Sequence, residues 1–344
     1  MSFVAASLSV CIIGNSLAFY YFDGPANPEL TFADALWYSI ISITTIGYGD
    51  LSASSLGARL GTVFFIVILG LSTFTVFFGM LIDWVSEFAL RGQLGLAAIR
   101  LKNHIIVVNF PGEPRVRQLL DELASDADHR HRGVVIISET IEKLPFSRNG
   151  VQFVRGSPLQ EETYERAGLA HAKMALVLAT SYSESSSDAI VASAISVLNE
   201  LNPQLHVVAE CLDEKHYMLF RAVKCNAVVP GVRIIGNLLA QEMSDPGIAQ
   251  MFDVITSNRI GDTVYSVPVS EPAGELGYRE MAKRLLDHDV NLLCVNRGED
   301  SHTHYSQMNP QAGDTFIYVA PARLTWAKLL GLVSGEQAIP TMVL

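Results

Sequence analysis

The stretch Thr44-Thr45-Ile46-Gly47-Tyr48-Gly49-Asp50 lies between two apolar segments, residues 2–22 and 56–90, that are each long enough to span a lipid bilayer. A short apolar stretch just before it, residues 32–43, is typical of a helix. Glycine adopts positive φ without a steric penalty, so Gly47 and Gly49 allow successive backbone carbonyls to point in one direction. Such a loop between two spans predicts a pore lining in which carbonyl oxygens replace the hydration shell of a cation.

The five residues Thr45, Ile46, Gly47, Tyr48 and Gly49 resemble the selectivity filter of potassium channels. The resemblance implies that K⁺ is the permeant ion and that four chains surround one axis as a homotetramer in the lipid bilayer. The alternative is an ordinary glycine turn, with the apolar N-terminus serving only as an anchor.

The segment before this loop predicts a helix that supports it. Thr31 is a residue type that caps helix N-termini. A helix over residues 32–43 crosses only part of the bilayer, at roughly 1.5 Å per residue. Its C-terminal end directs partial negative charge toward a cation in the pore. We expect Trp37 and Tyr38 to pack behind the filter and Asp50 to hydrogen-bond there.

Gly70 lies in the middle of the long apolar segment that follows the filter. Glycine inside a helix costs roughly 1 kcal/mol relative to alanine, and in membrane helices it allows close packing. The surrounding Ile68-Leu69-Gly70-Leu71-Ser72-Thr73-Phe74 resembles the hinge region of ligand-gated prokaryotic potassium channels. The resemblance implies that Gly70 is a gating hinge, and close packing is the alternative.

Flanking charge predicts the orientation of the two spans. Asp23 and Glu29 follow the first span, whereas Arg91, Arg100 and Lys102 follow the second. Positive residues stay on the cytoplasmic side, so we expect a multi-pass protein of the cell membrane whose remaining chain is cytoplasmic. The formal charge of −11 is carried mostly by that remainder, which argues against nucleic acid as a partner.

From residue 103 onward, strand patterns alternate with helix patterns. Predicted strands cover residues 104–108, 133–138, 151–155, 174–180, 206–210 and 227–229. Predicted helices cover residues 114–124, 160–167, 187–200 and 213–223. This alternation is typical of a Rossmann-like α/β fold with a doubly wound parallel sheet.

A break in the pattern is predicted at residues 243–256, followed by a small α+β lobe. Its predicted strands are residues 263–269, 292–295 and 315–319, and its predicted helix is 277–286. This order of modules resembles the RCK domain (regulator of K⁺ conductance), also called the KTN or TrkA-type domain. Two phrases strengthen the resemblance: Ala167-Gly168-Leu169 before the fourth strand, and Met308-Asn309-Pro310 leading to Gly313-Asp314.

The resemblance implies five parts, which are a two-helix pore module (1–90), a linker (91–102), a Rossmann-like lobe with its crossover (103–256), a C-terminal lobe (257–321) and a tail (322–344). The linker is too apolar for a disordered tether, so we expect it to pack on a neighbouring element. RCK domains of this family pair through the region after the sixth strand and build a gating ring. Extra RCK domains in that ring are therefore implied, and the apolar ending 338–344 is compatible with a second domain beyond it.

The turn Asn109-Phe110-Pro111-Gly112-Glu113-Pro114 stands where dinucleotide-binding folds carry their glycine-rich loop. Two of the three glycine positions hold proline, which lacks the N–H that would bind phosphate. Glu139 closes the second strand, where an acidic residue binds ribose hydroxyls, and Arg115 and Arg117 carry charge that suits phosphate. A purely structural loop is one interpretation. The other is a site for NAD or ADP formed by Asn109, Phe110, Gly112, Arg115, Arg117 and Glu139.

Glu184 follows the fourth strand and Glu210 ends the fifth, at the carboxyl edge of the sheet, where open α/β folds bind ligands. Both stand where calcium-gated RCK channels place calcium carboxylates, which implies a Ca²⁺ site. Leu212 stands at the position of the third carboxylate, so Asp213 or Asp188 would have to substitute for it. Solvated acids near helix starts are the alternative.

These features predict a tetrameric potassium channel gated by Ca²⁺ or an adenine nucleotide bound to a cytoplasmic RCK ring. They do not predict an enzyme, because residues 259–319 offer no catalytic His, Lys or Tyr with a convincing partner. The alternative of a different class is a membrane-anchored nucleotide sensor or oxidoreductase with no conducting pore.

Overall fold

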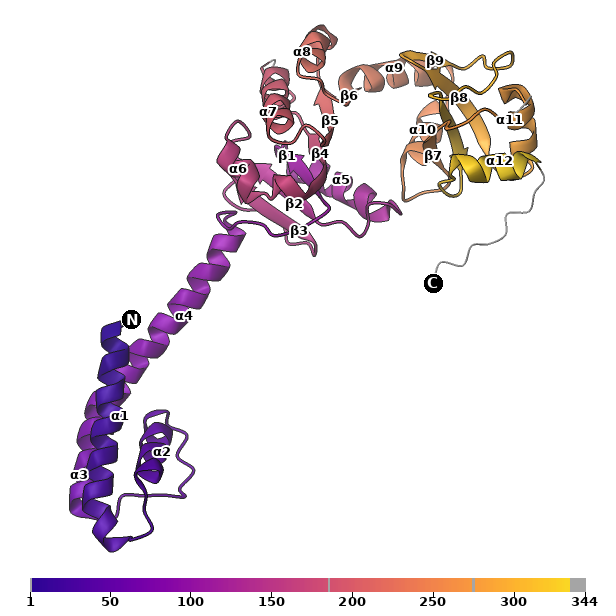
Figure 1. Cartoon of the computed structure of the whole chain (residues 1–344). Coiled ribbons are helices and arrows are strands. Elements are labelled where there is room, and N and C mark those ends of the chain that lie inside the picture. Colours follow the sequence, from indigo (N-terminus) through magenta and orange to yellow (C-terminus); the bar gives the residue numbers. More distant parts are fainter. Residues whose placement is uncertain (1, 185, 274–275, 335–344) are drawn as a thin grey trace. The chain divides into compact units, whose positions relative to one another are not determined.

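The computed structural model describes residues 2–184, 186–273 and 276–334, and the chain divides into two compact units, Met1–Leu94 and Gly95–Leu344 (Figure 1). The boundary lies inside the predicted linker. The apolar ending 338–344 lies outside the described residues.

The first unit is helical. It contains α1 (Ser2–Asp23), the 3₁₀ turn η1 (Gly24–Ala26), the pore helix α2 (Phe32–Ile43), α3 (Leu56–Thr62), the π-helical η2 (Val63–Gly70) and α4 (Leu71–Gln93). The last three form one uninterrupted helical segment of 38 residues, and it packs against α1 (Figure 1). Two segments, Phe3–Ala26 and Leu56–Gln93, are long and apolar enough to cross a membrane.

Polar contacts fix the pore helix α2. Thr31 and Asp34 form a capping box at its start, as the predicted cap requires. Ser39, buried in the middle of α2, accepts hydrogen bonds from Asn15 Nδ2 (2.8 Å) and Ser16 Oγ (2.9 Å) of α1. In an apolar surrounding, such buried polar contacts specify how α2 seats on α1.

The second unit begins with a six-stranded parallel sheet of order β3-β2-β1-β4-β5-β6. Its strands are β1 (His104–Val108), β2 (Val134–Ser138), β3 (Val151–Arg155), β4 (Ala172–Val177), β5 (His206–Cys211) and β6 (Ala227–Pro230). Its helical segments are α5 (Glu113–Ser125), α6 (Glu161–Arg166), η3 (Leu169–His171), α7 (Ser187–Leu201), η4 (Glu214–His216) and α8 (Tyr217–Ala222). Each strand starts within two residues of its predicted start, and β1 and β2 are buried throughout, as unbroken apolar runs indicate. The predicted doubly wound sheet is confirmed.

The linker packs on this sheet, as predicted. The Gly95 carbonyl oxygen accepts hydrogen bonds from the Arg155 amide (2.9 Å) and from Arg166 Nη1 (3.0 Å). The Ile99 amide donates to the Arg166 carbonyl oxygen at 2.7 Å. The linker is therefore tied to the end of β3 and to the end of α6.

Two helices follow the sheet, α9 (Gly231–Ser244) and α10 (Ile248–Thr256). The predicted break over residues 243–256 was wrong, because most of that range is α10. Gly247, at φ 106°, turns the chain, and the Glu242 carboxylate accepts hydrogen bonds from the Gly247 amide (2.9 Å) and the Ala249 amide (2.7 Å). This cap starts a new helix directly after the old one ends.

The C-terminal lobe is a four-stranded antiparallel sheet of order β7-β10-β8-β9, covered by helices. Its elements are β7 (Thr263–Pro268), α11 (Tyr278–Leu286), β8 (Asn291–Arg297), β9 (Asp300–His302), β10 (Thr315–Ala320) and α12 (Trp326–Ser334). The sequence placed residues 322–344 in a tail, whereas α12 belongs to the core of this lobe. Its buried Trp326, Leu329 and Val333 share one helical face, and burying them against the sheet holds the helix in place.

Asp314 ties this lobe together. Its carboxylate is buried and accepts hydrogen bonds from Arg297 Nε (2.7 Å) and Nη2 (2.8 Å), from the Tyr278 hydroxyl (2.7 Å) and from the Gln311 amide (3.0 Å). The hydrogen bonds from Arg297, followed by that from Tyr278, lower the pKa of Asp314 to about 2. The lobe is therefore stabilised by the ionised form of this carboxyl.

Asp314→Asn should destabilise the lobe by about 2 kcal/mol, because a hydrogen bond to a charged partner is lost in a buried place. Amide hydrogen exchange in β10 should become about 30-fold faster, since 1.4 kcal/mol is a factor of ten. Because the folded pKa lies below the unfolded value of 3.8, the wild-type contribution is complete above about pH 4 and fades as the pH falls toward 2. The exposed Asp300→Asn makes the same charge change in the same lobe and should leave β10 exchange unchanged. Equal exchange in both variants would contradict this role for Asp314.

Candidate functional site: the filter loop and the carboxyl edge of the sheet

The filter loop has an alternating backbone. Thr45, Gly47 and Gly49 have φ values of 62°, 56° and 79°, whereas Ile46 and Tyr48 between them keep negative φ. Alternating left- and right-handed residues direct successive carbonyls to one side of the chain and amides to the other. Thr45 is β-branched, so its left-handed conformation is strained. Strain of this kind persists where the surrounding structure enforces it.

Contacts with α2 hold the loop in this conformation. The amides of Ile46 and Gly47 donate to the Ile41 carbonyl oxygen at 3.1 and 3.3 Å. Trp37 Nε1 donates to Asp50 Oδ2 at 2.9 Å, and the Trp37 indole stacks on the Tyr48 ring with centroids 6.1 Å apart. Trp37 and Asp50 therefore support the loop from behind, as the sequence predicts.

Gly70 lies where the inner helical segment meets the end of the pore helix. Its φ of −68° is ordinary for a helix, but a Cβ here would lie 2.7 Å from the Phe65 carbonyl oxygen and 2.8 Å from Ile43 Cδ1. Ile43 is the last residue of α2 before the filter. The close approach itself requires glycine, and the hinge stays a prediction. The sequence contained no signal for the π-helical η2, because an i→i+5 turn has no residue pattern of its own.

Glu210 is a buried acid at the carboxyl edge of the sheet, and three groups donate hydrogen bonds to its carboxylate. Only 5% of its surface is exposed. Arg115 Nη2 donates to its Oε1 at 2.5 Å, the Tyr182 hydroxyl lies 2.9 and 3.0 Å from its two oxygens, and the Ala179 amide donates to Oε2 at 3.1 Å. Burial and the Glu210 carboxylate raise the pKa of Tyr182, so this hydroxyl stays protonated and donates. Sequence reasoning missed Tyr182, whose only signal was an aromatic residue within a serine-rich loop.

The other three predicted calcium ligands do not gather around Glu210. The buried Asp188 carboxylate accepts hydrogen bonds from the amides of Leu212 and Asp213, both at 2.9 Å. Asp213 Oδ1 accepts from the Lys215 amide at 3.0 Å, and Glu184 is exposed. Within residues 2–184, 186–273 and 276–334, no three His, Cys, Asp or Glu side chains come together as a metal site.

The predicted set of Glu184, Glu210 and either Asp213 or Asp188 is therefore not assembled in this structure. Asp188 and Asp213 bind backbone amides of the turn after β5 instead, which gives them a structural role.

The residues predicted to bind a nucleotide do not form one site either. Asn109, at φ 75° and 5% exposed, bridges two strand ends by donating from Nδ2 to the Leu178 carbonyl oxygen at 2.8 Å. Phe110 packs on the hydrophobic core. Gly112 precedes α5, and Glu139 is exposed after β2. Asn109 and Phe110, the first two residues of the loop after β1, therefore have structural roles.

The two arginines of α5 point to different partners. Arg115 binds Glu210, whereas Arg117 Nε donates to Glu113 Oε1 at 2.6 Å and its guanidinium lies 4.4 Å from the Phe146 ring centroid. The structure therefore does not bring them together as a phosphate site.

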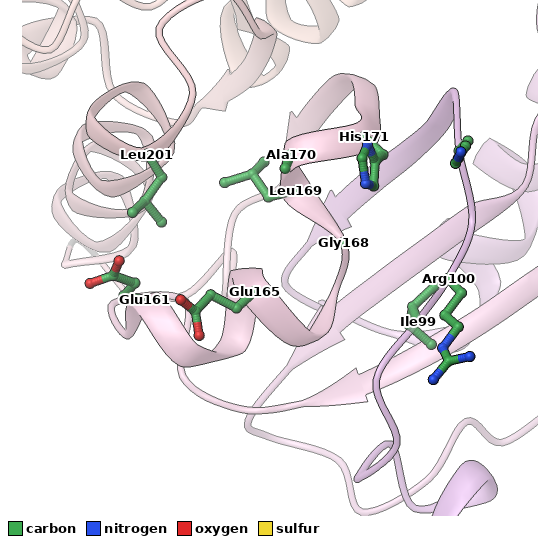
Figure 2. A pocket seen from close by; sticks show the side chains of 10 residues that line it. Ile99, Arg100, Glu161, Glu165, Gly168, Leu169, Ala170, His171 and Leu201 are labelled. Carbon is green, nitrogen blue, oxygen red and sulfur yellow. The ribbon is translucent and has the colours of Figure 1, made fainter.

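A surface pocket of about 620 Å³ lies at the opposite, amino edge of the sheet. Linker residues Ile99 and Arg100 form one side, and Glu161 and Glu165 of α6 line another part (Figure 2). The linker is thus a wall of a pocket and not only a connection. These residues lie more than 60 positions apart, so the sequence contained no signal for this pocket.

Two family models match the chain. The model described as "Ion channel" matches residues 8–87, and the model described as "Calcium-activated potassium channel slowpoke-like RCK domain" matches residues 100–208. The first match covers most of both apolar spans and the whole filter loop. The second covers the sheet from β1 into β5.

Curated potassium channels are similar to this chain. The calcium-gated potassium channel TvoK of Thermoplasma volcanium is 22% identical over 324 residues, covering 92% of this chain and 90% of that protein. The calcium-activated potassium channel slo-1 of Caenorhabditis elegans is 28% identical over 199 residues, covering 52% of this chain and 17% of that protein.

Among solved structures, the GsuK channel matches with a TM-score of 0.48 and 19% identity, covering 93% of this chain and 57% of GsuK. A structure of GsuK bound to ADP matches with a TM-score of 0.46 and 24% identity, covering 70% of this chain and 62% of that one. The two family models match residues in both units of the chain, and the match to TvoK covers 92% of it. The protein is therefore an ion channel that joins a pore of two membrane-spanning helices to an RCK regulatory domain.

Proposed function

We propose that this chain forms a K⁺-selective channel gated by a divalent cation that binds its RCK domain. The observation that carries the proposal is the alternating handedness at Thr45, Gly47 and Gly49, because it lines one side of the loop with carbonyl oxygens. Rings of such oxygens replace the hydration shell of K⁺. The name of TvoK, a calcium-gated potassium channel, supports the same conclusion.

The pore needs four copies of the chain. In the single chain the filter is open to one side, with Ile46 56% and Tyr48 68% exposed. One strand of carbonyls cannot surround an ion, whereas four around an axis can. A homotetramer in the cell membrane follows from this requirement, with the RCK domain in the cytoplasm because positive residues follow the second span.

The RCK domains pair through α9. This helix exposes Val232, Ile235, Leu239 and Met243, which recur along one helical face. An exposed apolar face of this length marks a protein interface. Pairing of copies through α9 would build the gating ring, and further RCK domains could join it through the same face.

Ca²⁺ is the proposed ligand, and Glu210 with Glu184 are its proposed carboxylates. Glu210 is buried at the ligand-binding edge of the sheet, and Glu184 lies two residues beyond Tyr182, which already contacts Glu210. A Cβ on Gly231, the first residue of α9, would lie 3.4 Å from Glu210 Oε1. A cation at Glu210 would therefore act directly beside the helix through which the domains pair.

The signal reaches the pore through the linker. Gly95 and Ile99 are hydrogen-bonded to β3 and α6, so a movement of the sheet moves the linker and the inner helix continuous with it. A cation shifts this equilibrium only by its differential affinity for the two ring conformations.

Potassium flux from the purified protein in liposomes tests the proposal. We expect K⁺ flux that exceeds Na⁺ flux and changes with Ca²⁺ on the RCK side. Glu184→Ala combined with Glu210→Ala should keep the flux and lose its dependence on Ca²⁺. No flux from ordered tetramers would favour a membrane-anchored sensor without a pore, and an unchanged calcium response in the double variant would place the cation elsewhere.

A further inference from the structure

The buried carboxylate of Glu210 already holds a cation that belongs to the protein. Arg115 Nη2 lies 2.5 Å from Glu210 Oε1, and the Arg115 side chain is 47% exposed while that of Glu210 is 6% exposed. A buried carboxylate is costly without a positive partner. Here the positive partner is Arg115, a half-exposed residue of α5 whose guanidinium extends to the buried Glu210 carboxylate.

The remaining bonds of Glu210 come from neutral groups. They are the Tyr182 hydroxyl and the Ala179 amide, and neither supplies a full positive charge. The Arg115 guanidinium also lies 5.0 Å from the Tyr182 ring centroid, so the same arginine contacts both the carboxylate and the loop after β4. Among the described residues, Arg115 forms its ion pair with Glu210 alone.

We infer that Arg115 is a tethered competitor for the divalent cation at Glu210, so that this one residue sets how much Ca²⁺ is needed for gating. This inference rests on the proposed function and adds how the calcium sensitivity of the channel is set. A divalent cation that coordinates Oε1 is repelled by the guanidinium bonded to the same oxygen, because two positive charges then lie a few ångströms apart in a buried place, and release of Arg115 removes this repulsion. The measured cation affinity is then reduced by the free energy of the Arg115–Glu210 pair.

The geometry favours exchange over permanent pairing. The half-exposed Arg115 side chain is long and begins on the first turn of a helix, so it can return to solvent without unfolding the domain. Glu210 cannot follow, because its strand is paired on both sides with β4 and β6. Release of Arg115 is therefore the step that opens the carboxylate to a diffusible ion.

Arg115→Gln tests the inference by calorimetric titration of the detergent-solubilised full chain with CaCl₂. We expect Ca²⁺ to bind about tenfold more tightly than to the wild type, as the loss of a competing charge-assisted hydrogen bond implies. Arg115→Lys keeps a positive charge without the planar fork and should give an intermediate affinity.

Arg148→Gln is the matched control. Arg148 makes the same kind of pair at 2.6 Å with Asp121, also on α5, and the substitution removes the same charge. It should leave the Ca²⁺ affinity at the wild-type value. If both glutamine variants gained the same Ca²⁺ affinity, the cause would be the general loss of positive charge and not direct competition at Glu210, and the inference would fail. An unchanged or lower Ca²⁺ affinity in Arg115→Gln would also overturn it. Failure of the proposed function is separate, because it would appear as absent K⁺ flux.

Discussion

Gly47→Ala should reduce K⁺ flux by at least about a hundredfold, because alanine at positive φ costs roughly 1–2 kcal/mol in each chain of the proposed tetramer. Gly47 has φ 56°, and the space around it is open, so the penalty is a backbone effect and not a steric clash with a neighbour. Alanine would favour negative φ at this position and turn its carbonyl away from the pore. Flux of K⁺ from liposomes measures the loss.

Gly24→Ala provides the control for this substitution. Gly24 also has open space around it but lacks positive φ, so the same added methyl group should leave the flux within about twofold. Size-exclusion chromatography with light scattering would show whether both variants keep the oligomeric state. A Gly47→Ala tetramer that conducts like the wild type would refute the assignment of the filter.

Gly70→Ala should reduce flux by at least about tenfold, because a steric overlap at this depth costs roughly 1–3 kcal/mol per chain. The added Cβ would lie 2.7 Å from the Phe65 carbonyl oxygen and 2.8 Å from Ile43 Cδ1. Relief requires η2 to rewind or Ile43 to move, and Ile43 ends the helix that carries the filter. We expect the displaced Ile43 to distort the filter loop that follows it, which would be measured as a loss of K⁺ flux.

The double variant Gly70→Ala with Ile43→Val distinguishes packing from hinge motion. Valine removes Cδ1, so part of the flux should return if the contact with Ile43 causes the loss. A pure hinge role predicts no rescue, since valine at position 43 gives no flexibility to residue 70. Gly79→Ala, in α4 with open space around it, should keep the wild-type flux.

Much of the fold follows from local patterns. The pore helix α2 begins and ends where the sequence predicts, because Thr31 and Asp34 form a cap within one turn. The six parallel strands are also local signals, since a strand buried on both faces needs an unbroken apolar run. The helices α9, α10 and α12 were not predicted from the sequence, and a side-chain cap starts α10 while packing on a distant sheet holds α12.

At the candidate cation site, too, the sequence did not predict contacts between residues that are far apart in the chain. Glu184, Glu210, Asp188 and Asp213 all belong to the carboxyl edge of the sheet by strand order. Sequence order did not reveal that the Asp188 carboxylate accepts hydrogen bonds from the amides of Leu212 and Asp213. Nor did it reveal that Arg115, 95 residues before Glu210, reaches the carboxylate that was assigned to calcium.

The sequence by itself determined the two apolar spans, the short helix between them and the alternation of strands and helices, because each depends on neighbours within one turn, one loop or one apolar run. Tertiary structure alone decided which acids are free, which glycine touches the pore helix, and where the linker is held. Those outcomes depend on side chains that meet across large sequence separations, and a carboxylate has the same letter whether a backbone amide, an arginine or a diffusible ion neutralises it.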